Sequence, residues 1–86
     1  MDEVRPEIKL FAEEMEKKMR KHDNRKGDSW KSMTIPELEM MLDNEIQEYR
    51  LAGDNWGAME ELIDIANFAM MLYHHYKEKE VKENEG

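Results

Sequence analysis

Four acidic residues form two pairs whose spacing could support metal chemistry. Two residues separate Glu45 from Glu48, and two separate Glu61 from Asp64. Residues three apart lie on the same face of an α-helix, so each pair would present its two carboxylates together. Clustered carboxylate oxygens suit hard divalent cations such as Mg²⁺ and Mn²⁺, and the chain has no cysteine to offer a softer ligand. The four acids are therefore the candidate metal ligands.

Both pairs occupy helical positions where apolar residues are expected. Glu45 falls in the middle of an apolar stripe and Glu48 at its margin, whereas Glu61 and Asp64 share a second stripe with aliphatic and aromatic residues. The stripe residues are Leu38, Met41, Leu42, Tyr49 and Ala52 on the first helix and Ile65, Phe68 and Leu72 on the second. Packing the two helices would bring four carboxylates to one point, which is unfavourable without a cation because like charges repel.

An alternative interpretation is that these acids are ordinary surface charges or partners of Arg50 and lysine side chains. A single Glu-x-x-Glu means little in a chain with 21 acidic residues, and Glu13 and Glu16 form such a pair. Two pairs that both fall on apolar stripes are harder to explain by chance, because acids in a core are the expected exception at a functional site. We therefore favour the metal interpretation.

Three predicted α-helices position the acids. Apolar residues repeat at helical spacing over about residues 6–24, 35–52 and 56–79. Residues 25–33 are predicted to form a loop, and the tail 81–86 is expected to fray because it has little to bury. The chain has no internal repeat and no linker rich in proline or glycine. We therefore predict one all-α domain over residues 1–86.

Capping signals mark the ends of these helices. Thr34 precedes Glu37 by three residues, which is the spacing of a capping box at the start of the second helix. Gly53 is placed to end that helix. Asn55 follows in a turn-forming segment and is the expected N-cap of the third helix.

The third predicted helix is apolar almost all the way round. Its apolar residues are Leu62, Ile63, Ile65, Ala66, Phe68, Ala69, Met70, Leu72 and Tyr73. Two other short helices cannot cover so many faces, and a chain of 86 residues has only a marginal core of its own. We therefore expect a three-helix protomer that assembles into a helical-bundle homo-oligomer, either a dimer or a tetramer.

The charge balance restricts the partners. The chain has 13 basic and 21 acidic residues and a net charge of −8, which disfavours binding to nucleic-acid polymers and to anionic membranes. No apolar run is long enough to span a bilayer, and the first residues lack the basic and apolar regions of a signal peptide. We expect a cytoplasmic protein.

The order of the acids resembles a known family signature. Glu45-Ile46-Gln47-Glu48, then residues 49–60, then Glu61-Leu62-Ile63-Asp64, is similar to the Glu-x-x-Glu and Glu-x-x-Asp array of the MazG-like all-α nucleoside triphosphate pyrophosphohydrolases. The flanking segments Lys26-Gly27-Asp28-Ser29-Trp30 and Asp64-Ile65-Ala66-Asn67-Phe68-Ala69-Met70-Met71 are similar to a phage and archaeal branch described as dATP/dGTP diphosphohydrolase-like. The similarity covers about residues 22–76.

This resemblance implies an enzyme that uses Mg²⁺, or Mn²⁺, to split a (deoxy)nucleoside triphosphate into the monophosphate and pyrophosphate, in house-cleaning or control of purine dNTP pools. It implies that Glu45, Glu48, Glu61 and Asp64 are the catalytic residues and the metal ligands. Glu48, at the margin of its stripe, is alternatively the group that takes a proton from the attacking water. Members of the family are dimers or tetramers of helical bundles, as expected from the apolar third helix.

Four further residues are candidates for substrate binding, each with a structural alternative. Lys26 and Lys31 either contact phosphates or are solvated cations near a helix end, which is how we interpret Lys17 and Lys18. Trp30 either stacks on a base or fills a gap between helices. Asn67 either hydrogen-bonds a ribose or base, or bridges two helices.

Two other functions are compatible with the same sequence. Phosphoribosyl-ATP pyrophosphatases share the architecture and differ in substrate. A non-enzymatic helical module for oligomerisation or regulation would instead pair the acids with arginine and lysine across an interface. Metal that binds only the folded protein must raise its melting temperature, so thermal melts with and without Mg²⁺ separate this module from an enzyme.

Overall fold

The computed structural model describes the backbone of residues 3–85, most of which is helical, and the side chains of residues 3–23 and 27–83. The elements in this part are α1 (Pro6–Lys26), the short 3-10 helix η1 (Ser29–Ser32), α2 (Ile35–Leu51) and α3 (Asn55–Glu85). No strand occurs between residues 3 and 85. The prediction of an all-α chain with three α-helices is confirmed.

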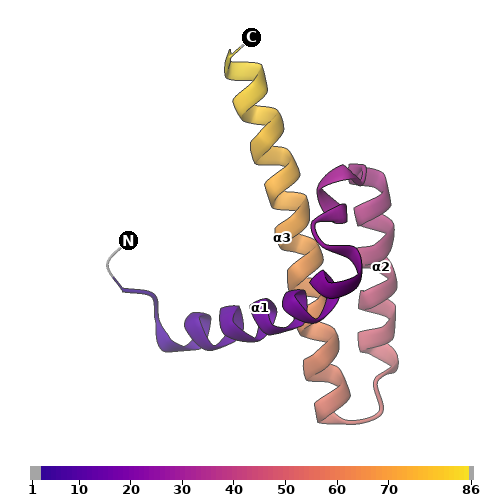
Figure 1. Cartoon of the computed structure of the whole chain (residues 1–86). Coiled ribbons are helices and arrows are strands. Elements are labelled where there is room, and N and C mark those ends of the chain that lie inside the picture. The colour runs from indigo at the N-terminus through magenta and orange to yellow at the C-terminus, as the bar shows by residue number, and fades with distance from the viewer. Residues whose placement is uncertain (1–2, 86) are drawn as a thin grey trace.

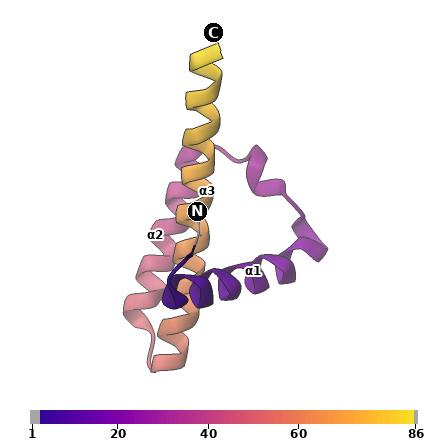
Figure 2. The same cartoon turned by 90° about the vertical axis from the view of Figure 1, so that its left-hand side faces the viewer.

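α2 and α3 form an antiparallel pair, and α1 crosses this pair (Figure 1). A short turn at residues 52–54 joins the two helices of the pair. α3 is longer than α2, so its C-terminal part extends past the start of α2. η1 leads the chain from the far end of α1 back to α2 (Figure 2) and contacts α3. The fold therefore has two parts, the α2–α3 pair and the segment formed by α1 and η1, and a site can lie between them.

The capping box at the start of α2 is present as predicted. The Thr34 side chain accepts a hydrogen bond from the backbone N–H of Glu37, and the Glu37 carboxylate accepts one from the backbone N–H of Thr34. The start of α3 differs from the prediction. Asp54, not Asn55, is the capping side chain, since its Oδ1 accepts a hydrogen bond from the Gly57 N–H at 2.7 Å. Aspartate and asparagine cap equally well, so only the geometry of the turn decides between them.

The other boundaries shift at their C-terminal ends. α1 continues to Lys26 and ends at Gly27, whose φ of 54° is a left-handed conformation that favours glycine. The predicted loop 25–33 contains η1. α3 continues through the predicted tail 81–86 as far as Glu85, because glutamate and lysine have high helix propensity and extend a helix whose packed part is already formed.

The buried core is small. Among the described side chains, the buried apolar residues are Leu38 on α2 and Ile63 and Met71 on α3, together with the polar residue Asn67. Many large apolar side chains on α1 and α3 remain exposed, such as Ile8 and Leu10. None of the described helices is both long and apolar enough to cross a membrane.

Candidate metal centre

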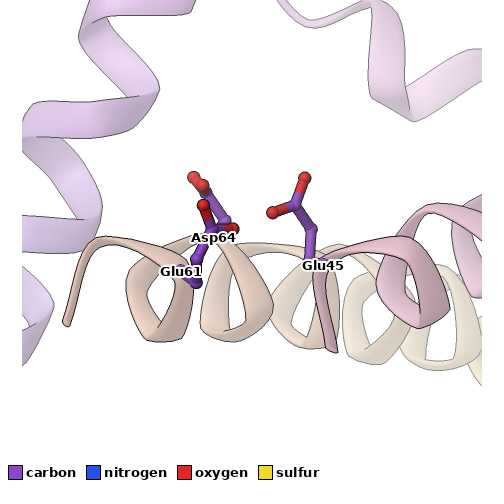
Figure 3. A group of neighbouring side chains, drawn as sticks. All are labelled: Glu45, Glu61 and Asp64. Carbon is purple, nitrogen blue, oxygen red and sulfur yellow. The ribbon is translucent and has the colours of Figure 1, made fainter. Parts of the chain in front are cut away.

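Three of the four predicted ligands lie together where α2 packs against α3. Glu45 comes from α2, and Glu61 and Asp64 come from successive turns of α3. Each offers a carboxylate oxygen, and these oxygens all lie within 4.8 Å of one another. Figure 3 shows the three carboxyl groups on the same side of the helix pair, with Glu45 leaning toward the other two. We call these three residues the acid cluster.

The acid cluster is electrostatically unfavourable by itself. Burial, hydrogen bonding to Glu61 and repulsion by Asp64, Glu48 and Glu61 raise the pKa of Glu45 to about 8, from an ordinary value of 4.5. The Oε2 atoms of Glu45 and Glu61 are buried and have no hydrogen-bond partner among the described residues. Buried acceptors without partners are costly, so these oxygens are suited to a ligand that supplies positive charge.

The donor set fits a hard divalent cation. All three groups are carboxylates, and Mg²⁺ prefers oxygen ligands at about 2.0–2.1 Å, so oxygens on opposite sides of one ion lie about 4.2 Å apart. The span of up to 4.8 Å is slightly wider, and small side-chain movements would close it. With three protein ligands, the remaining positions of a six-coordinate ion stay open for water and phosphate oxygens.

Glu48, the fourth predicted ligand, lies outside the acid cluster. Its side chain is exposed at the margin of the α2 stripe, as the helical spacing predicts. Its charge still contributes to the raised pKa of Glu45, so it lies within electrostatic reach. This position favours a role beside the cluster over direct metal binding.

Lys18 on α1 belongs to the site, although its interpretation as a solvated residue excluded it. Its Nζ atom lies 3.2 Å from Oδ2 of Asp64 and 2.8 Å from Oε2 of Glu60. The side chain is only 20 % exposed, so the solvated interpretation is wrong. Helical spacing places Lys18 at the edge of the apolar stripe of α1, but this spacing does not say which residues of another helix Lys18 meets.

A cavity of about 400 Å³, the acid-edged cavity, opens beside the cluster and is enclosed by α1, η1, α2 and α3. Glu45, Asp64 and Lys18 lie at its charged side. The apolar and aromatic lining residues are Met19, Trp30, Met33, Met41, Phe68 and Met71. A molecule that is charged at one end and flat and apolar at the other matches this lining.

Two predicted substrate-binding residues make contacts within the protein. Trp30 is half-buried in η1, lines the acid-edged cavity and has a buried Nε1 with no partner among the described side chains. It therefore fills space between helices and also faces the cavity. Asn67 is 5 % exposed, and its Nδ2 donates a hydrogen bond to the Met15 carbonyl oxygen at 3.3 Å. The bridging role of Asn67 between α3 and α1 is thus observed.

Lys31, one of the two predicted phosphate-binding lysines, is not brought to the acid cluster. Lys31 pairs with Asp28 at 3.3 Å, lies over the Trp30 ring and lines a different cavity. The side chain of Lys26 lies outside the described part of the chain.

Comparison with known proteins adds no relative to this description. No family model, curated protein or solved structure matches the chain. The functional interpretation therefore depends on the geometry of the acid cluster and on the sequence signature that its residues carry.

Proposed function

We propose that this protein is a Mg²⁺-dependent nucleotide pyrophosphohydrolase that cleaves a (deoxy)nucleoside triphosphate to the monophosphate and pyrophosphate. The observation that carries the proposal is the convergence of Glu45, Glu61 and Asp64 beside a cavity that Glu45 and Asp64 line and whose other side is apolar and aromatic. The resemblance of the acid array to MazG-like pyrophosphohydrolases supports the same reaction.

Glu45, Glu61 and Asp64 would hold the metal ion. Their buried oxygens have no partner within the described part of the chain, which supports this assignment. When bound, Mg²⁺ or Mn²⁺ neutralises phosphate oxygens and lowers the pKa of a coordinated water. The carboxylates must be ionised to bind, so occupancy of the site is coupled to release of the proton that the raised pKa of Glu45 retains.

The surrounding residues take the remaining roles. Lys18 lies beside Asp64 and can neutralise a phosphate oxygen of the substrate. Glu48, exposed next to the cluster, is assigned to accept the proton of the attacking water. Trp30 and Phe68 line the apolar side of the cavity and can pack against the base.

Homo-oligomerisation belongs to the same proposal. A second, apolar groove lies between the first part of α1 and α3, and five of its six apolar side chains are exposed. These side chains are Ile8, Leu10, Phe11, Met59 and Leu62. Because the protomer core is small, covering this groove with a second copy would supply the burial that the chain lacks. Sedimentation equilibrium on the full chain measures the assembly directly.

A product-resolved substrate screen tests the enzymatic proposal. The chain is incubated with each NTP, each dNTP and phosphoribosyl-ATP in Mg²⁺, and the assay separates monophosphate plus pyrophosphate from diphosphate plus phosphate. We expect the first product pair and a loss of turnover in Glu45→Gln and Asp64→Asn. Glu13→Gln, which changes an exposed acid on α1, is the matched control and should retain activity.

Other results of the screen would support a different function or a different site. Hydrolysis of phosphoribosyl-ATP alone would assign the related pyrophosphatase activity. Wild-type rates in Glu45→Gln would show that the site is wrongly assigned. The pairing of Lys18 with Glu60 and Asp64 across helices favours a non-enzymatic module as the second candidate, and that function predicts no turnover and no stabilisation by Mg²⁺.

A further inference from the structure

A second charged cavity lies between η1, the start of α2 and the C-terminal part of α3, and we call it the basic cavity. It has a volume of about 630 Å³, within the range of about 300–1,000 Å³ that small-molecule sites occupy. Its lining residues are Lys31, Ile35, His74, His75, Glu78, Lys79 and Lys82. Three lysines and one glutamate give it a positive charge, in a chain whose net charge is −8.

The lysines of the basic cavity are available to an anion. Lys79 and Lys82 form no ion pair with any side chain in residues 3–23 and 27–83. Lys31 pairs with Asp28 at 3.3 Å, but the two side chains are 51 % and 66 % exposed. An exposed ion pair of this kind contributes little free energy, so a multiply charged anion can replace Asp28 as the partner of Lys31.

The histidines of this cavity are held in place by Trp30. His75 Nε2 lies 3.0 Å from the Trp30 carbonyl oxygen and therefore donates a hydrogen bond to it. The Trp30 ring packs edge-on against His74, with 5.2 Å between ring centroids, and against His75 at 6.1 Å. The wall of the basic cavity is thus an organised arrangement of side chains from η1 and α3.

We propose that the basic cavity binds a multiply charged phosphate group, as in pyrophosphate or the phosphate chain of a nucleotide, without a metal ion. Lysine ammonium groups are compact charges with several N–H donors, which suits an anion that carries many acceptor oxygens. The site is distinct from the metal centre, because no residue lines both the basic cavity and the acid-edged cavity. It does not depend on the chain being an enzyme.

Trp30 can report binding at this site, because its ring contacts both histidines of the basic cavity. It also lines the acid-edged cavity, so the titration is made in EDTA, where no metal ion can hold a phosphate at the acid cluster. The other tryptophan, Trp56, is 71 % exposed at the start of α3 and is replaced by phenylalanine to leave a single signal. The Trp56→Phe chain is titrated in EDTA with pyrophosphate, inorganic phosphate and ADP, and calorimetry measures the same binding in the unmodified chain. We expect saturable binding of pyrophosphate that weakens as NaCl is added.

Variants locate the bound anion. In Lys79→Gln/Lys82→Gln we expect the dissociation constant for pyrophosphate to rise about tenfold or more, because a hydrogen bond between charged groups has at least that worth. Lys77→Gln is the matched control, since Lys77 pairs with Glu80 at 3.9 Å and does not line the cavity. Glu45→Gln should bind pyrophosphate as the unmodified chain does.

The outcomes separate this proposal from the enzymatic one. The ligand is a free inorganic anion if pyrophosphate binds more tightly than ADP, and a nucleotide if ADP binds more tightly. Absence of saturable binding in EDTA, or equal losses in the Lys77→Gln control and the double variant, would overturn the proposal. A strict requirement for Mg²⁺ together with loss of binding in Glu45→Gln would also overturn it, because the anion would then belong to the metal centre.

Discussion

The Nζ atom of Lys18 lies 3.2 Å from Oδ2 of Asp64, so α1 places a positive charge at the edge of the acid cluster that α2 and α3 form. The same Nζ lies 2.8 Å from Oε2 of Glu60 and 3.2 Å from the Glu60 carbonyl oxygen. Burial lowers the pKa of Lys18, but hydrogen bonds to Glu60 and Asp64 outweigh this effect and hold the pKa above its ordinary value. Lys18 therefore stays charged, and it would compete with a metal ion for Asp64.

Replacement of Lys18 should have opposite effects on metal affinity and on metal-free stability. In Lys18→Met we expect Mg²⁺ to bind about tenfold more tightly, because a competing positive charge is removed. In EDTA, the free energy of unfolding should fall by about 1–2 kcal/mol, because Asp64 loses its charged partner. Calorimetry and thermal melts measure the two effects. Lys17→Met is the control, since Lys17 pairs only with Glu14 at 3.3 Å. If Lys18→Met binds Mg²⁺ as weakly as Lys17→Met does, Lys18 does not compete with the metal ion.

Metal binding at the acid cluster should stabilise the fold. A ligand that binds only the folded protein adds about 2.7 kcal/mol at 100 times its dissociation constant, so the melting temperature should rise with Mg²⁺ or Mn²⁺ concentration. Glu45→Gln and Asp64→Asn should lose this rise. Glu45→Gln should also melt at a higher temperature than wild type in EDTA, because it removes a carboxyl group whose ionisation is opposed by burial and by its acidic neighbours. An unchanged melting temperature of the wild type at millimolar Mg²⁺ would favour the non-enzymatic module.

The raised pKa of Glu45 predicts a pH dependence of the metal-free protein. Between the ordinary pKa of 4.5 and the folded-state value of about 8, the folded chain keeps a proton that the unfolded chain releases. The contribution of Glu45 to the free energy of unfolding should therefore fall as pH rises through this window. Urea unfolding in EDTA at several pH values measures the free energy of unfolding. The difference between wild type and Glu45→Gln isolates the contribution of Glu45. A wild-type slope equal to that of Glu45→Gln would mean that Glu45 titrates normally.

The residues of α2 and α3 show what helical periodicity can predict about this site. Glu45, Glu61 and Asp64 come together because three-residue spacing fixes the face of each helix, and because their apolar neighbours drive these faces into contact. Glu48 also lies where the spacing predicts, at the margin. The pattern within one helix was sufficient because the two helices are joined by a short turn and pack side by side.

Helical periodicity could not predict what α1 contributes to the site. Lys18 reaches Asp64 only because α1 crosses α3, and a crossing angle depends on which side chains interlock across the interface. Lys31 follows Trp30 directly in η1 but lines the basic cavity, whereas Trp30 lines the acid-edged cavity, because consecutive side chains of a 3-10 helix point in different directions. Side-chain spacing along one element does not contain this information.

Asn67 should contribute to stability through its contact with α1. Its buried Nδ2 donates a hydrogen bond to the Met15 carbonyl oxygen at 3.3 Å, so Asn67→Ala should lower the free energy of unfolding by about 1–2 kcal/mol. Urea unfolding with Asn44→Ala, which changes an exposed residue on α2, provides the comparison. A variant that unfolds as wild type does but has a raised KM for the nucleotide would instead support the substrate contact considered for this residue.

Variants of Glu48 and Glu45 should distinguish a role in proton transfer from a role in metal binding. Glu48 lies outside the acid cluster but close enough to raise the pKa of Glu45, so Glu48→Gln should leave the Mg²⁺ affinity within about twofold of wild type. If Glu48 accepts the proton of the attacking water, the variant should lose about 10²–10⁴-fold in kcat with little change in KM. Glu45→Gln, by contrast, should lose both metal affinity and turnover. Calorimetry with Mg²⁺ and steady-state kinetics measure the two properties, and a matched loss of metal affinity in both variants would make Glu48 a ligand.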